Sequence, residues 1–171
     1  MKSLFFSLLL FIGHLSFAGY SDSLQAALKN VKDDTTRLFL LDELVWEYLY
    51  SDIDKSQNYA VQAIFLSQKS EYPRLAARAH HTRATVFLQQ NQNDSALVHF
   101  RKAIKVYTDN GLENLSAGSY NGIGNVYIYR GVFEKSLENY LQALRILEKY
   151  NSHKQKIGLV TANIGVVYFN L

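Results

Sequence analysis

The chain has 171 residues, of which 48% are hydrophobic, 19% charged and 13% aromatic, and it contains no cysteine and one proline. This composition fits one globular domain and excludes disordered, collagen-like and disulfide-stabilised chains. The lack of cysteine also excludes thiolate zinc sites. The formal net charge of +3 is too small to indicate a nucleic-acid partner, so none is expected.

The N-terminal residues have the order of a signal peptide. Lys2 precedes an apolar run from Leu4 to Ile12, and Ser16 and Ala18 are the small residues that a signal peptidase reads. We therefore expect residues 1–18 to be a signal peptide and the protein to be exported, either periplasmic or membrane-associated. An uncleaved anchor is the alternative, although the run is shorter than the roughly 20 residues of a membrane-spanning helix.

An internal repeat of about forty residues organises the rest of the chain. Shifting the sequence by 40 aligns small or apolar residues in three copies, and each copy has the spacing of an amphipathic helix. The aligned sets are Ser56, Ala96 and Ser136; Ala60, Phe100 and Tyr140; Ala63, Ala103 and Ala143; and Ile64, Ile104 and Leu144. We predict an all-α fold of antiparallel helix pairs without strands.

Helix-ending residues lie between the repeated blocks. Asn91-Gln92-Asn93 ends one helix, Asp94 caps the next, and Asn110-Gly111 closes it. Arg130-Gly131 repeats that ending. The turn from Tyr50 to Asp54 is one residue shorter than its later counterparts, so the first unit departs from the pattern.

Pairs of small residues twelve positions apart, Ala84 with Ala96 and Gly124 with Ser136, resemble the pattern of the tetratricopeptide repeat (TPR) family. The resemblance implies a right-handed α-solenoid, in which small residues such as Gly124 and Gly165 let neighbouring helices approach closely. A period near forty indicates the extended variety of the repeat. The expected organisation is a leading capping helix at 19–37, a degenerate repeat at 38–73, repeats at 74–116 and 117–157, and a partial fourth repeat at 158–171.

The last predicted helix begins a fourth unit without its second helix. Ile164, Val167, Tyr168 and Leu171 are therefore expected to lack a covering helix. One interpretation, which we favour, is that the chain is the N-terminal part of a longer protein. The other is that the last helix pairs with another chain, for instance by self-association.

The sequence contains no convincing catalytic or metal-binding pattern. Gly122-x-Gly124 lacks the third glycine of a dinucleotide-binding loop. His80 and His81 point about 100° apart on a helix, with no further ligand one turn away. Serine, histidine and aspartate occur without the strand-turn-helix setting of a nucleophile. We therefore expect no enzyme activity, no cofactor and no metal.

The concave face, formed by the first helix of each unit, is the expected ligand-binding surface. Helical spacing from the small-residue columns directs eight side chains toward it: Trp46, Tyr50, Arg78, His81, Asn121, Asn125, Tyr129 and Asn163. The TPR resemblance implies that the asparagines hold the extended backbone of a peptide or protein ligand through paired hydrogen bonds. Alternatively, they bond neighbouring helices across the groove and order the superhelix.

Charge alternates between the first two units. Residues 38–73 carry six acidic and two basic residues, whereas residues 74–105 carry six basic residues and one acidic residue. The first interpretation is attraction between adjacent repeats. The second is a stripe of Arg74, Arg78 and His81 that faces an anionic group and responds to pH through the histidine.

Two functions remain for a non-catalytic chain of this kind. The first is an exported TPR scaffold that binds a protein or peptide. The second is the sensory input domain of a longer membrane-associated protein, either a histidine kinase or a transcription regulator, with its output part beyond residue 171. The second rests on resemblance to bacterial TPR-containing signalling regulators, in which a signal peptide, a leading helix and a degenerate first unit, here from Leu41, precede extended repeats. Membrane contact is expected only through that further sequence or an uncleaved anchor.

Overall fold

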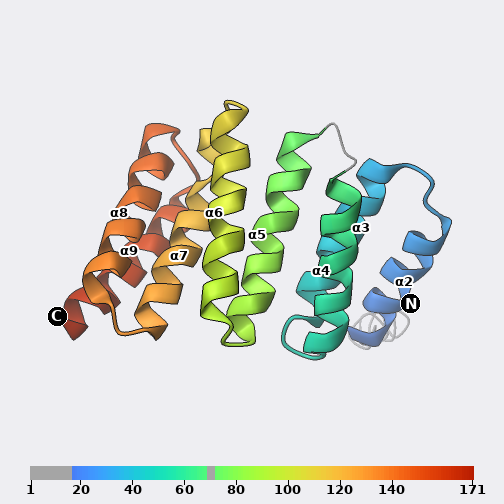
Figure 1. The fold of residues 1–171 in the computed structure, drawn as a ribbon, viewed down its shortest axis with the longest axis horizontal. Helices are drawn as coiled ribbons and strands as arrows, with labels where there is room; N and C mark the ends of the chain where they lie inside the picture. Colours follow the sequence, from blue (N-terminus) through green and yellow to red (C-terminus); the bar gives the residue numbers. More distant parts are fainter. Residues whose placement is uncertain (1–16, 69–71) are drawn as a thin grey trace, which may run out of the picture.

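The computed structural model describes residues 17–68 and 72–171, which form helices joined by short turns and contain no strand (Figure 1). The predicted all-α architecture is confirmed. The helices are α2 (Phe17–Asn30), α3 (Asp34–Tyr48), α4 (Ile53–Ser67), α5 (Pro73–Gln89), α6 (Asn93–Asp109), the 3-10 helix η1 (Glu113–Leu115), α7 (Ala117–Tyr129), α8 (Phe133–Lys149) and α9 (Lys154–Asn170). The predicted signal peptide lies outside the described residues, except for residues 17 and 18 at the start of α2.

The helices follow one another along the long axis, from α2 at one end to α8 and α9, which overlap in this view, at the other (Figure 1). Three antiparallel pairs, α3–α4, α5–α6 and α7–α8, pack on one another, and α9 packs on α8. Direct contacts also join α3 to α5 and α5 to α7, whereas no comparable contact joins α4 to α6 or α6 to α8 in the described part of the chain. The odd-numbered helices therefore form the inner layer of a solenoid.

Four of the turns end their helices in the same way. In each, one residue adopts a positive φ, and the next amide donates to a carbonyl five residues earlier. After α7, for example, Val132 N donates to Tyr127 O at 2.9 Å. The positive-φ residues are Asn91 (58°), Gly111 (69°), Gly131 (68°) and Asn151 (47°). The predicted helix ends at Asn91, Gly111 and Gly131 are thus confirmed.

Helix starts match the prediction less well. The Asp52 carboxylate caps α4 by accepting from Lys55 N at 3.1 Å. Asp94, predicted to cap α6, does not do so, because α6 already begins at Asn93 and Asp94 lies inside its first turn. Its carboxylate instead accepts from Arg130 Nη2 at 2.6 Å and links two successive pairs.

Small residues bring the two helices of a pair close together. A Cβ on Gly124 would lie 2.4 Å from the Tyr140 ring, so the predicted steric role of Gly124 is confirmed. The buried Ser136 hydroxyl donates to Gly124 O at 2.9 Å, which adds a polar bond to the same contact. The predicted close approach at Gly165 is wrong, since that glycine has no neighbour within 4 Å of its Cβ position and faces open space.

The C-terminal helix is covered on one side only. Ile164 and Val167, predicted to lack a covering helix, are buried together with Val160 and Tyr140, because positions 160, 164 and 167 share the face that packs on α8. Tyr168, Phe169 and Leu171 are exposed, with 90% of Phe169 accessible. Self-association through this outer face stays a prediction.

We predict opposite effects from two glycine-to-alanine substitutions. Gly124→Ala should lower the free energy of unfolding by about 1–3 kcal/mol, because the new methyl group overlaps the buried Tyr140 ring. Gly165→Ala should raise it by up to about 1 kcal/mol through helix propensity alone. Urea unfolding followed by circular dichroism measures both. Equal effects would contradict the helix register described above.

Candidate ligand-binding groove

The inner layer opens into a groove between α7 and α9. Although α5 packs directly on both α3 and α7, α7 and α9 hardly touch. Two neighbouring hollows occupy this space. The first hollow, of about 300 Å³, is lined by His81, Tyr107, Asn114, Leu115, Ala117, Gly118, Asn121, Leu147, Ser152, Lys156, Leu159 and Val160. The second hollow, of about 350 Å³, is lined by Asn121, Asn125, Ile128, Tyr129, Tyr140, Leu159, Asn163 and Val166.

An asparagine pair bridges the groove between the two helices. Asn163 Nδ2 on α9 donates to Asn121 Oδ1 on α7 at 2.9 Å. Asn121 and Leu159 line both hollows, so the two spaces adjoin each other at the bridge. Because each carboxamide has more donors and acceptors than this single bond uses, hydrogen-bonding capacity remains on both side chains.

The second hollow carries a further polar pair. The Tyr140 hydroxyl of α8 donates to Asn125 Oδ1 at 2.6 Å. Burial raises the pKa of Tyr140, which keeps this hydroxyl protonated as the donor. No bond to Asn125 Nδ2 is found among the described residues, which leaves this donor for a ligand. Tyr129, exposed in the last turn of α7, also lines the hollow.

His81 of α5 forms part of the wall of the first hollow. Its Nδ1 lies 3.0 Å from Ser119 Oγ, and its ring packs against Phe100 with centroids 5.4 Å apart. Burial lowers the pKa of His81 to about 4, with Arg78 acting in the same direction and Asp42 opposing it. The imidazole is therefore neutral at pH 7. Among the described residues that line the two hollows, only Lys156 is then charged.

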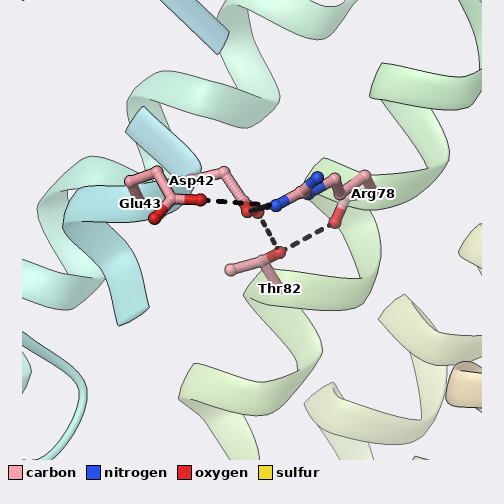
Figure 2. A network of polar contacts seen from close by, with 4 residues as sticks. All are labelled: Asp42, Glu43, Arg78 and Thr82. Atoms are coloured by element: carbon pink, nitrogen blue, oxygen red, sulfur yellow. Dashed lines mark hydrogen bonds and ion pairs between the residues drawn. The ribbon is translucent and has the colours of Figure 1, made fainter. Parts of the chain in front are cut away.

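Arg78 is engaged by acidic residues of α3 rather than free for a ligand (Figure 2). Its Nε donates to Asp42 Oδ2 at 2.8 Å, and its Nη2 lies 3.8 Å from Glu43 Oε1. Thr82 Oγ1 donates to the other carboxylate oxygen of the buried Asp42 at 2.5 Å. These contacts of Arg78 with Asp42 and Glu43 are the predicted attraction between the acidic first repeat and the basic second repeat.

Two members of the anion-facing stripe expected from Arg74, Arg78 and His81 are therefore not free cations. Asp42 neutralises the guanidinium of Arg78, and the low pKa of His81 removes the expected second charge. Because the pKa of His81 is about 4, the expected response of this histidine to pH lies near pH 4 rather than near neutrality.

The structure brings together five of the eight residues predicted for the concave face. His81, Asn121, Asn125, Tyr129 and Asn163 line the two hollows. Trp46, Tyr50 and Arg78 do not line them. Trp46 lies on α3, and Tyr50 follows that helix and is 79% exposed. Arg78 lies on α5, three residues before His81, and bonds Asp42 of α3.

Sequence reasoning missed the apolar part of the groove. Leu159 and Val166 lie four residues before and three residues after Asn163, on the same face of α9. Extending the helical spacing from Asn163 in both directions would have found them. Tyr107, Leu147 and Lys156 of the first hollow come from three different helices, and no local pattern connects them.

Neither a metal site nor a membrane-spanning helix is found in the described part of the chain. Within residues 17–68 and 72–171, no three histidine or acidic side chains gather in a way that could hold a metal ion. No helix in the same part of the chain has the length and hydropathy needed to cross a membrane.

The stacked pairs and the inner groove define the chain as a TPR-like α-solenoid. The family model for SNAP, soluble NSF attachment protein, matches residues 51–164, which is well over half of the sequence. The chain therefore belongs to the SNAP family of TPR-like helical repeat proteins. No curated protein sequence shows significant similarity to it.

Solved structures share the fold at low sequence identity. BtubC from P. vanneervenii is 21% identical with a TM-score of 0.74, and the match covers 90% of this chain and 64% of BtubC. The apo form of RapI is 21% identical with a TM-score of 0.71, over 97% of this chain and 65% of RapI. Aspartyl phosphate phosphatase F from Bacillus subtilis is 24% identical with a TM-score of 0.65, and the match covers 71% of this chain and 32% of the phosphatase. The chain thus spans less than two thirds of the length of each of these proteins.

We predict that Asp42 stabilises the contact between the first two pairs. Asp42→Ala should lower the free energy of unfolding by about 1–3 kcal/mol, because Arg78 and Thr82 lose their buried acceptor. Asp94→Ala, which removes the exposed partner of Arg130, should cost less than about 1 kcal/mol. Urea unfolding compares the two variants. A loss at Asp42 no larger than that at Asp94 would refute the stabilising role.

The pKa of His81 predicts an acid-sensitive fold. A histidine whose pKa is about 4 when folded and near 6.5 when unfolded contributes stability that is fully present above pH 6.5 and is lost as the pH falls toward 4. Between pH 7 and pH 5 we expect a loss on the order of 1–2 kcal/mol from this residue. Burial also lowers the pKa of His99 to about 4, so a second histidine adds to the loss. Unfolding at both pH values should show a smaller decrease for His81→Gln than for the wild type; parallel decreases would contradict the assignment.

Proposed function

We propose that the protein is a non-catalytic scaffold that holds an extended segment of a protein or peptide in the groove between α7 and α9. The observation that carries the proposal is the pair of adjoining hollows, lined by three asparagines of α7 and α9, two of which bond each other across the groove. A peptide group offers one donor and one acceptor, and a carboxamide can satisfy both at once. The groove therefore matches the main chain of an extended ligand.

The charge of the groove favours an uncharged main chain over an acidic tail. The second hollow has no ionised lining residue among those described, and Lys156 alone is charged at the first. Recognition of an acidic segment requires several cations or charge-assisted donors. Arg78, the nearest candidate on α5, is already neutralised by Asp42.

Family membership supports a scaffold function. The family takes its name from attachment to NSF, and its members are TPR-like helical repeat proteins. A groove of this kind can hold a protein partner, which agrees with the attachment role in the family name. The solved structures support the fold of this scaffold.

Export and a sensory role extend this proposal. The order of Lys2, the apolar run and Ala18 supports export to the periplasm or to a membrane-associated position. If the chain is followed by a membrane helix and a kinase or DNA-binding part, ligand binding in the groove is the input of that protein. If it is not, the solenoid acts as a free binding module.

Random dodecapeptides displayed on phage test the binding proposal. We predict that the folded protein enriches a peptide, and that Asn163→Ala weakens its binding about five- to tenfold, the usual range for one lost neutral hydrogen bond. Asn58→Ala, an exposed asparagine on α4, is the matched control and should bind like the wild type. Fluorescence polarisation with a labelled synthetic copy of the peptide gives the affinities. Failure to enrich any peptide would overturn the proposal.

The export prediction is tested by N-terminal sequencing of the protein expressed with its own leader in a Gram-negative host. We expect a mature chain that begins at Gly19 and is recovered with the periplasmic fraction. Replacing Ala18 by Leu should block this processing, because the peptidase requires a small residue there. An intact Met1 in the membrane fraction would instead identify an anchor.

A further inference from the structure

The first hollow differs in chemistry from the rest of the groove. Its floor consists of apolar groups that belong to the core, among them Leu147, Val160 and Ala117, each less than 5% exposed. The polar side chains Asn114, Asn121, Ser152 and Lys156 are exposed or half-buried, and the remaining polar lining groups are the neutral His81 and the buried Tyr107. A concave apolar floor with a few polar groups at its edge is the usual form of a pocket that takes an apolar group.

We propose that the first hollow is a specificity pocket for one large apolar side chain, aliphatic or aromatic, of the bound peptide. This inference rests on the proposed function and names the feature of the peptide that the groove selects. The volume of about 300 Å³ accommodates a branched aliphatic or aromatic side chain. His81 is neutral and Lys156 is exposed to solvent, so nothing on the floor would compensate a buried carboxylate.

The asparagine bridge sets the position of this side chain along the peptide. Asn121 lines both hollows, so a peptide bonded to it has its main chain in the second hollow and can direct the adjacent side chain into the first. The ligand's peptide group would enter between the two carboxamides, with its N–H donating to Asn121 Oδ1 and its carbonyl accepting from Asn163 Nδ2, in place of the bond that joins the two asparagines. The exchange loses no hydrogen bond, and the buried side chain supplies the gain in affinity.

Gly118 is a position at which a side chain can be added beside the pocket. It lies in the first turn of α7 and lines the first hollow, and a Cβ there would meet only His81 Cε1, at an ordinary 3.5 Å. Gly118→Phe therefore adds a ring at the pocket while leaving Asn125 and Asn163 in place. Gly165→Phe is the matched control, because Gly165 also has open space around it but lines neither hollow.

The test uses the same phage-displayed dodecapeptides and synthetic copies of those enriched. We expect the enriched peptides to share one position occupied by Leu, Ile, Met, Phe, Tyr or Trp. Alanine at that position should weaken binding to the wild type about 10- to 100-fold, the value of burying one large apolar side chain. With Gly118→Phe the same alanine substitution should change the affinity less than about threefold, since the pocket is already occupied. Gly165→Phe should retain the full effect.

The possible failures are distinguishable. Enriched peptides without a shared apolar position would overturn the specificity pocket and leave the binding function intact. An undiminished alanine effect in Gly118→Phe would do the same, by placing the apolar side chain elsewhere in the groove. If the protein enriches no peptide at all, the proposed function fails, and the pocket assignment fails with it. Thermal melts of both glycine variants establish that each is folded before binding is compared.

Discussion

The solenoid depends on the contact between the two helices of each pair, where small residues let the helices approach closely. At Gly124 the absence of a Cβ admits the ring of Tyr140, and the Ser136 hydroxyl bonds the carbonyl of the same glycine. Ser56 and the Val45 carbonyl repeat that bond in the first pair at 2.8 Å. Such close packing leaves each pair too thin to enclose a core of its own. The pairs therefore bury their apolar faces against one another, which makes stacking a condition of stability.

Stacking distributes polar groups unevenly along the inner layer. Near the N-terminal end, the facing helices α3 and α5 carry opposite charges, and Asp42 and Arg78 neutralise each other at their contact. Toward the C-terminal end, α7 and α9 face each other with uncharged asparagines and diverge. The first arrangement closes the inner surface, whereas the second leaves a groove that a ligand can enter. This difference explains why some of the expected binding residues line the hollows and others do not.

Five of the eight expected inner residues line the groove because helical spacing correctly identifies which face of a helix points inward. The same reasoning failed for Arg78 and for the charge of His81. A partner for Arg78 lies 36 residues away on another helix, and the low pKa of His81 results from neighbours on several helices. Neither can be read from spacing along one helix. The burial of Ile164 and Val167 was missed for a related reason, since α9 is covered by α8 even without a second helix of its own.

By itself, the sequence determined the helices, most of their ends and their pairing. Each of these depends on residues close together along the chain: the glycines and asparagines that adopt positive φ, the small residues twelve positions apart and the period of forty. Only the tertiary structure decided where the inner layer opens, which charges are neutralised and which apolar side chains remain uncovered. Those properties depend on distances between helices and on the removal of water from side chains, and the repeat period is nearly the same where the layer is closed and where it is open.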